Sequence, residues 1–191
     1  MNITHRGCAR ISIRAVMVSA LLMSAVASTG AQNEGTTLKF EGGIGVIPVS
    51  SGVLDDGTAT TALVAPSVTR NIVRGVQPAG QIWVIDDLDA KVRADGKITV
   101  EGKGLILAGG NNAGRAAGQS VFATLICQAA APFTESSTTL AGVLLSPTGD
   151  FKINDTLAPV PPAICQSPML LIRNAAGGAW FAVGKFRPDD R

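Results

Sequence analysis

The densest group of side chains able to do chemistry is acidic, because Asp86, Asp87 and Asp89 stand close together in the chain. Two converging carboxylates can hydrolyse a glycosidic bond when one is protonated and acts as the acid while the other is ionised. Several carboxylate oxygens can instead bind Ca²⁺. A structural interpretation is simpler: Asp87 and Asp89 form the solvent face of a strand, and Asp86 caps a turn.

Other catalytic groups are scarce. The single histidine, His5, lies near the N-terminus in a segment that we expect to be removed. Without it a serine or cysteine nucleophile has no imidazole base, and no lysine stands three residues after a serine. We therefore expect a protein that is not an enzyme and that needs no cofactor and no metal, with the aspartates as a weak Ca²⁺ alternative.

The glycine-rich stretch over residues 109–118 (GGNNAGRAAG) contains the polar side chains Asn111, Asn112 and Arg115. It is not a phosphate-binding loop, because it lacks both the Gly-Lys-Ser/Thr sequence and the G-x-G-x-x-G spacing. The composition predicts a surface loop. Because loops often carry binding residues, a ligand-binding loop with Arg115 at its tip is the functional alternative.

Two adjacent aromatic residues, Trp180 and Phe181, are a second candidate contact. On a strand they point to opposite faces. If one face is solvated, an exposed ring can stack on a sugar or a peptide. If both faces are covered, both rings belong to the core.

Residues 1–31 are typical of a secretory signal peptide. Three arginines precede an apolar run of 13 residues, 15–27, and small residues follow it. Cleavage is expected to leave a mature N-terminus between Ser28 and Gln32, so residues 32–191 form one domain of a secreted or periplasmic protein. No later stretch is apolar enough to predict a membrane span in the mature chain.

Composition narrows the class of protein further. The 191 residues are 46% hydrophobic, 16% charged and 4% aromatic, with 22 Gly and 10 Pro, a pattern typical of a globular β protein. Three of the 16 basic residues belong to the leader, so 13 remain against 14 acidic ones and the net charge becomes −1. With no basic cluster in the mature chain, we expect no nucleic-acid partner.

Two cysteines, Cys127 and Cys165, remain after the leader. In an exported protein a lone pair of cysteines is most simply a disulfide bond. Free buried thiols are the alternative, and a zinc site would need more ligands than two thiolates.

Short apolar runs between Gly, Pro, Asn and Asp clusters predict an all-β domain. We expect a two-sheet, Greek-key-like sandwich of about seven to nine strands, with a closed β-barrel as the alternative. The expected strands include the following runs: Thr36–Phe40, Ile44–Val49, Leu105–Leu107, Val121–Cys127, Met169–Arg173 and Ala179–Val183. Lys185–Arg191 is expected to be a polar tail.

The clearest element is a hairpin over residues 88–107, in which apolar and polar residues alternate with period two. A two-residue loop at Asp95-Gly96 would oppose apolar to polar residues. A three-residue loop over 94–96 pairs Val92 with Ile98 and unites the apolar face. It also places Gly96 where a positive φ is needed. A second hairpin is expected between residues 138–145 and 151–153, around the turn at residues 146–149.

Several segments between Lys97 and Gly184 resemble a group of uncharacterised exported bacterial proteins. The segments that carry the resemblance are Gly104–Gly110 (GLILAGG), Ser120–Cys127 (SVFATLIC), Leu170–Asn174 (LLIRN) and Ala179–Ala182 (AWFA). The resemblance covers about half of the mature chain. It implies export and a β-rich fold, and it implies no activity and no functional residue.

The sequence thus predicts an exported, non-enzymatic protein that binds a partner or contributes structurally at the cell envelope or outside the cell. One alternative is a Ca²⁺-binding or carboxylate-dependent hydrolytic module that uses Asp86, Asp87 and Asp89. The other is a secreted inhibitor or ligand carrier that uses the 109–118 loop.

Overall fold

The structure, a computed structural model, describes residues 37–50 and 69–188. Within these residues it contains thirteen β-strands and no helix. The strands are β1 (Leu38–Gly45), β2 (Val49–Ser50), β3 (Thr69–Arg70), β4 (Trp83–Val84), β5 (Asp87–Val92), β6 (Lys97–Lys103), β7 (Ile106–Leu107), β8 (Ser120–Ile126), β9 (Glu135–Ser137), β10 (Val143–Leu144), β11 (Phe151–Thr156), β12 (Met169–Asn174) and β13 (Trp180–Arg187). The predicted all-β class is confirmed. The predicted leader, residues 1–31, lies outside the described residues.

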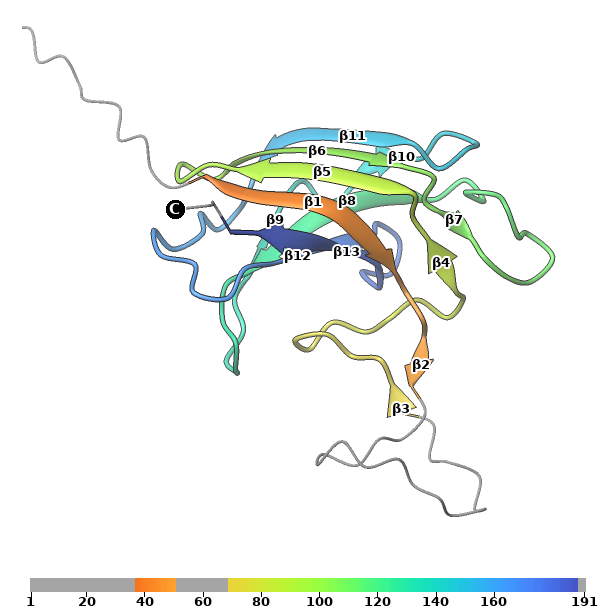
Figure 1. The fold of residues 1–191 in the computed structure, drawn as a ribbon, viewed down its shortest axis with the longest axis horizontal. Helices are drawn as coiled ribbons and strands as arrows, with labels where there is room; N and C mark the ends of the chain where they lie inside the picture. The colour runs from red at the N-terminus through yellow and green to blue at the C-terminus, as the bar shows by residue number, and fades with distance from the viewer. Residues whose placement is uncertain (1–36, 51–68, 189–191) are drawn as a thin grey trace, which may run out of the picture. The chain divides into compact units, whose positions relative to one another are not determined.

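Nine strands form one antiparallel sheet in the order β10-β8-β12-β13-β1-β5-β6-β11, with β9 also paired to β8 (Figure 1). The sheet bends back on itself, because Ser137 at the end of β9 and Ala158 after β11 exchange two backbone hydrogen bonds, at 3.0 and 2.8 Å. The sheet is therefore nearly closed and barrel-like, and the barrel alternative describes it rather than two stacked layers. Closure pairs strand edges that would otherwise expose backbone N–H and C=O groups.

A side-chain contact supports the same closure. The backbone N–H of Thr139 donates a hydrogen bond of 2.8 Å to Oδ2 of Asp155. This bond holds the pKa of Asp155 below its ordinary value. The remaining strands form two small ladders, β2 with β3 and β4 with β7.

Side chains fill the interior of the barrel-like sheet. Inward and outward residues alternate strictly along β5 and β6, as the period-two pattern predicts. The following large side chains are less than 2% exposed: Phe40, Leu88, Ile98, Leu125, Leu170 and Ile172. A small barrel packed in this way leaves its two ends as the places where a ligand can bind.

The predicted register of the first hairpin is confirmed. Val92 lies opposite Ile98 and Ala90 opposite Val100, and φ of Gly96 is 83°. The register places two cations, Arg93 and Lys97, at the mouth of the loop. Asp95 lies between them, 3.7 Å from Nε of Arg93 and 3.5 Å from Nζ of Lys97, which offsets their repulsion.

We expect Gly96→Ala to lower the free energy of unfolding by about 1 kcal/mol, because an alanine at positive φ is strained. A Cβ at this position would meet its neighbours only at 3.5 Å or more, so the cost is conformational and not steric. Gly96→Asn is the matched variant and should cost less, since asparagine tolerates this conformation better. Urea denaturation of both variants checks the order, and an equal loss would contradict the conformational explanation.

Three expected elements differ from the structure because their pairing is non-local. The predicted run Thr36–Phe40, from Leu38 on, and the first two residues of the predicted run Ile44–Val49 lie in one strand, β1, with a bulge between Phe40 and Gly43, and Val49 begins β2. The second predicted hairpin forms only its turn, where the N–H of Ser146 bonds to the carbonyl of Asp150 at 2.9 Å. Beyond that turn, β10 pairs with β8 and β11 pairs with β6, because each finds a longer partner.

Other predicted segments also need correction. The predicted polar tail, Lys185–Arg191, begins as strand, since β13 continues to Arg187, which lies opposite Lys39. Residues 105–107 are not a central strand: β7 covers two residues and pairs only with β4. The prediction for 121–127 is confirmed, because β8 is buried on both faces between β12 and the β9 and β10 edge.

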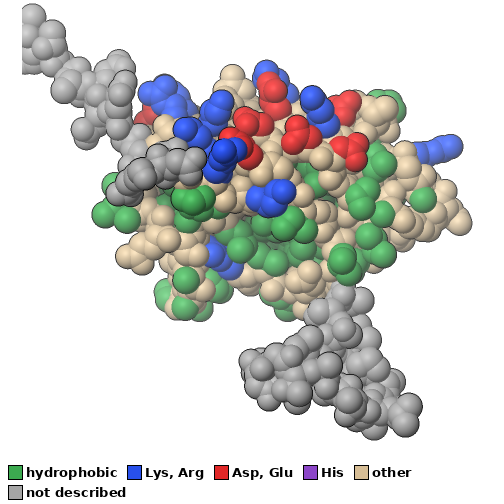
Figure 2. All heavy atoms as spheres, viewed as in Figure 1, with side chains coloured by type: hydrophobic (Ala, Val, Ile, Leu, Met, Phe, Trp, Pro, Cys, Tyr) green, Lys and Arg blue, Asp and Glu red, His purple; other side chains and the backbone are tan. Residues whose placement is uncertain are grey.

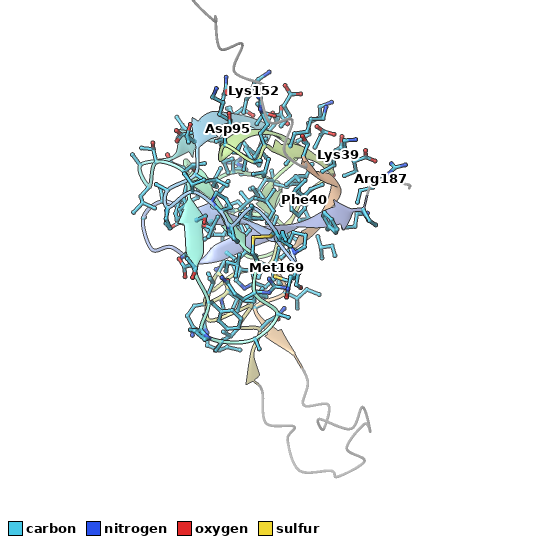
Figure 3. The ribbon with its side chains drawn as sticks, turned by 90° about the vertical axis from the view of Figure 1, so that its left-hand side faces the viewer. Lys39, Phe40, Asp95, Lys152, Met169 and Arg187 are labelled. Atoms are coloured by element: carbon cyan, nitrogen blue, oxygen red, sulfur yellow. A yellow bond between two sulfur atoms is a disulfide. The ribbon has the colours of Figure 1, made fainter. Side chains whose placement is uncertain are left out.

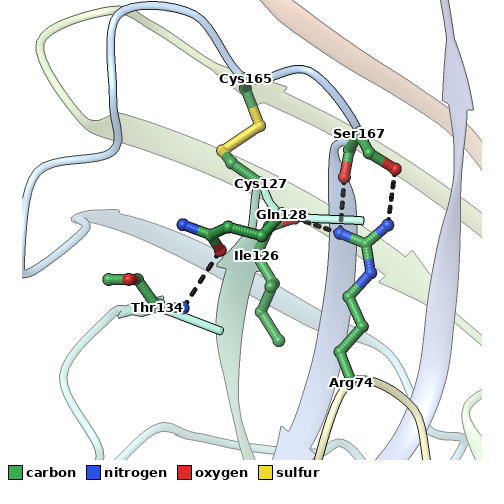
Figure 4. The surroundings of a disulfide bond; sticks show 7 residues. All are labelled: Arg74, Ile126, Cys127, Gln128, Thr134, Cys165 and Ser167. Atoms are coloured by element: carbon green, nitrogen blue, oxygen red, sulfur yellow. Dashed lines mark hydrogen bonds between the residues drawn. A yellow bond between two sulfur atoms is a disulfide. The ribbon is translucent and has the colours of Figure 1, made fainter. Parts of the chain in front are cut away.

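The predicted disulfide bond joins Cys127, directly after β8, to Cys165, before β12 (Figure 4). Arg74 lies beside it and donates hydrogen bonds to the carbonyl of Ile126, at 2.8 Å, and to the carbonyl and hydroxyl oxygens of Ser167, at 2.6 and 2.7 Å. The disulfide bond and the Arg74 guanidinium together hold the segment around Arg74 and residues 165–167 to the end of β8.

Candidate binding cleft

A cleft of about 360 Å³ lies at the end of the sheet where β1 finishes and β13 begins. Three segments far apart in sequence form it: residues 79–83, the 107–119 segment and residues 174–181. A backbone hydrogen bond joins the first and third segments directly, from Ala79 N to Trp180 O at 3.1 Å. Val46 bridges the same two segments, because its carbonyl accepts from Trp83 N at 3.1 Å and its N–H donates to Phe181 O at 2.9 Å. The lining residues are Ala79, Gly80, Gln81, Trp83, Leu107, Asn111, Asn112, Ala117, Gln119, Asn174, Ala179 and Phe181.

Two stacked aromatic rings line the apolar side of the cleft. The ring centroids of Trp83 and Phe181 lie 4.1 Å apart, with 13° between their planes. Both residues are buried, at 4% and 5% exposed. Such stacking adds to the energy of burial and fixes both rings.

Trp180 points to the other side of β13 and is buried as well, with its indole N–H bonded to the carbonyl of Asn71 at 3.0 Å. Trp180 and Phe181 therefore both pack in the interior, and neither forms an exposed platform. Phe181 contributes to the cleft only as part of its wall.

One pair of amide side chains forms a fixed polar wall. Nδ2 of Asn174 donates to Oε1 of Gln119 at 2.6 Å. Oδ1 of Asn174 accepts from the N–H of Gly177 at 2.8 Å, and Nε2 of Gln119 donates to the carbonyl of Ala117 at 3.2 Å. These bonds set the orientation of both amides before any ligand arrives.

Three further amides, Gln81, Asn111 and Asn112, are exposed at the mouth of the cleft. Within residues 37–50 and 69–188 their side chains form no hydrogen bond. Each carries one acceptor oxygen and two donor N–H groups available to a ligand.

The 109–118 loop is held in place by its own backbone. The N–H of Gly114 bonds to the carbonyl of Leu107 at 2.8 Å, and the N–H of Leu107 bonds to the carbonyl of Arg115 at 3.1 Å. Of the three predicted loop residues, Asn111 and Asn112 line the cleft, whereas Arg115 is exposed outside it.

None of the described residues that line the cleft is charged. Acidic and basic side chains gather instead on the outer face of β5, β6 and β11, where Figure 2 shows them interspersed. There Asp89 lies opposite Glu101, and Lys152 pairs with Glu101 and holds its pKa below the ordinary value. This surface is a mixed-charge face and is separate from the cleft.

The structure does not gather the three predicted aspartates into a site. Asp87 and Asp89 lie on the exposed face of β5, as the structural interpretation expects. Oδ1 of Asp87 accepts the backbone N–H of Leu88 at 2.9 Å, and the side chain of Asp86 lies against Gly104. In the described ranges, no group of three His, Cys, Asp or Glu side chains is placed to hold a metal ion.

The sequence did not identify Gln81, Gln119, Asn174 or Trp83 as residues of a binding site, although all four line the cleft. Gln81 and Asn174 are 93 residues apart, and no local motif marks either one. Their segments meet because Pro78 and Ala79 bond along Trp180 of β13, which lies opposite Arg173 of β12.

Among the described residues, no helix is long and apolar enough to cross a membrane. Searches of protein-family models, curated proteins and solved structures found nothing that matches this chain.

Proposed function

We propose that this protein is an exported binding protein whose cleft takes a small, uncharged, hydroxyl-rich ligand such as a saccharide. The observation that carries the proposal is the set of three unpaired amides, Gln81, Asn111 and Asn112, facing the fixed Gln119–Asn174 pair. A sugar hydroxyl both donates and accepts hydrogen bonds, and an amide side chain does the same.

The apolar wall supports the same class of ligand. The buried Trp83–Phe181 pair gives the cleft a rigid apolar wall for the C–H groups of a sugar, while the amides at the mouth bond to its hydroxyls. A volume of about 360 Å³ lies at the low end of the range for small-molecule sites. It suits one or two sugar rings.

Binding is favoured over catalysis because the cleft walls, within the part of the chain that the structure describes, contain no titratable side chain. A general acid or base must stand within hydrogen-bond reach of the reacting group. The hydrolytic alternative would need Asp86, Asp87 and Asp89, which stand outside the cleft.

Export to the periplasm or the medium is part of the proposal. The leader-like residues 1–31 and the resemblance to exported proteins support it. The Cys127–Cys165 disulfide is consistent with an oxidising compartment.

Trp83 provides a direct test, because it is one of only two tryptophans in the chain. In a Trp180→Phe variant it becomes the sole reporter, and its ring lines the cleft. Glucose, N-acetylglucosamine, maltose and cellobiose are titrated against glucosamine and gluconate as charged analogues. We expect at least one neutral sugar to change the Trp83 emission saturably, and the charged analogues to bind more weakly.

Variants at the mouth of the cleft complete the test. Asn111→Ala or Gln81→Ala should weaken binding of that sugar roughly 3- to 10-fold, the effect of one or two lost hydrogen bonds. Asn154→Ala is the matched control, because Asn154 is exposed on β11 outside the cleft. The proposal would be overturned if no neutral sugar changed the Trp83 emission. It would also be overturned if Asn111→Ala, Gln81→Ala and Asn154→Ala all had the same affinity for the sugar.

A further inference from the structure

The Gln119–Asn174 pair of the cleft has hydrogen-bonding groups that no described residue uses. A primary amide has two N–H donors and an oxygen that accepts two hydrogen bonds. Nδ2 of Asn174 gives one N–H to Gln119, and its Oδ1 accepts one bond, from Gly177. Nε2 of Gln119 gives one N–H to the carbonyl of Ala117, and its Oε1 accepts one bond, from Asn174. Each amide therefore keeps one N–H and one acceptor position.

Backbone partners fix the orientation of both amides. The N–H of Gly177 can only donate and the carbonyl of Ala117 can only accept, so neither amide can turn over without losing a hydrogen bond. Asn174 is only 8% exposed, so its remaining N–H has little water to bond to. A ligand group that accepts from this N–H loses little by desolvation and gains specificity.

The pair stands in an apolar wall. The lining residues without a polar side-chain atom are Ala79, Gly80, Leu107, Ala117, Ala179 and Phe181. Charged side chains such as Asp95 and Lys152 lie on the outer surface, whereas Phe40 packs inside the sheet (Figure 3). A hydroxyl group would satisfy the two amides but would leave the apolar wall uncovered. A group complementary to both has an amide of its own and a methyl group beside it.

We propose that the Gln119–Asn174 pair binds the acetamido group of an N-acetylated sugar. This inference rests on the proposed sugar-binding function and names its substrate class. The acetamido carbonyl accepts a remaining N–H of the pair, and the acetamido N–H donates to a remaining acceptor position. The methyl group packs against the apolar wall, to which Leu107 and Phe181 belong.

The test compares three sugars that differ only at C2, titrated by fluorescence in the Trp180→Phe background. N-acetylglucosamine carries an amide with a methyl group, N-formylglucosamine an amide without it, and glucose a hydroxyl. We expect N-acetylglucosamine to bind about tenfold more tightly than glucose, and N-formylglucosamine about threefold more tightly than glucose. Saturation-transfer NMR with the wild-type protein should show the acetyl methyl protons as the most strongly saturated protons of the ligand.

A disaccharide separates two sources of the same group. If N,N′-diacetylchitobiose binds more tightly than N-acetylglucosamine, the cleft takes the end of an acetamido polymer. If the two bind equally, the cleft takes a single sugar. Both results support the acetamido group at the amide pair, provided that the monosaccharide series shows the expected preference.

One variant assigns the preference to the amide pair. Gln119→Leu keeps the approximate size of the side chain and removes its amide, so N-formylglucosamine should lose its advantage over glucose. The preference for N-acetylglucosamine over glucose should fall from about tenfold to about threefold, the part that the methyl group supplies. Gln128→Leu is the matched control: Gln128 is also half-buried and bonded, to Thr134 N at 3.1 Å, but lies outside the cleft. It should leave both preferences unchanged.

The inference and the proposed function fail in different ways. If no neutral sugar binds, both are wrong. If neutral sugars bind without a preference for N-acetylglucosamine, or if the Gln128 control lowers that preference as much as Gln119→Leu does, the acetamido assignment alone is wrong. Weaker saturation of the acetyl methyl than of the ring protons would also overturn it. The sugar series and the NMR experiment need no substitution at Gln119, so they decide the matter even if that variant does not fold.

Discussion

Replacing Cys127 and Cys165 together by alanine is expected to lower the free energy of unfolding by about 4 kcal/mol. The bond closes a loop of 38 residues, and removing it restores the conformational freedom of that loop in the unfolded chain. The loop contains β9, β10 and β11, which are the strands that close the barrel-like sheet.

The region of the protein that loses stability is as informative as the size of the loss in unfolding free energy. Native-state hydrogen exchange should accelerate most at the amides of Ser137 and Ala158, whose two mutual bonds close the sheet. Amides in the β12–β13 ladder should be less affected, because that pairing lies outside the loop. Urea denaturation of wild-type protein under reductant is the control and should show the same loss. A loss below about 1 kcal/mol, or a uniform change in exchange, would contradict this role of the disulfide.

Gly45→Ala is the second substitution with a large expected effect, about 3 kcal/mol of lost stability. A Cβ at position 45 would crowd the carbonyl oxygen of Trp83 and lie 2.7 Å from the Cα of Val84. Both obstacles are backbone atoms, so no side-chain rotation relieves the clash. The close approach of the two backbone segments is also fixed by the hydrogen bond from Trp83 N to Val46 O, at 3.1 Å.

The same substitution should disturb the cleft, because Trp83 lines it and would be displaced with its backbone. We expect a lower urea midpoint together with a shift in Trp83 emission in the Trp180→Phe background. Gly109→Ala is the matched control: its Cβ would meet nothing within 4 Å, and it should stay within about 0.5 kcal/mol of wild type. Equal losses in the two alanine variants would show that the close approach at Gly45 does not matter.

The sequence alone determined the features that depend on residues close together in the chain, or on a residue type that leaves few possible pairings. The register of the β5–β6 hairpin follows from period-two alternation and from one glycine at the loop, both local properties. The disulfide pairing of Cys127 with Cys165 was predictable because no third cysteine follows the leader. Burial of β8 on both faces was predictable from its uninterrupted apolar run.

Tertiary structure decided what depends on pairing between distant segments. The turn at residues 146–149 is local and forms as expected, but the strands beyond it take separate neighbours, β8 for β10 and β6 for β11. Closure into a barrel-like sheet rests on the Ser137–Ala158 bridge, which no alternation pattern specifies. The amides of the cleft have no common motif and meet through contacts between distant segments: Ala79 with Trp180, β4 with β7, and Asn174 with Gln119. Backbone hydrogen bonding between strands carries no residue-specific code, so residue types predict which segments become strands better than which strands become neighbours.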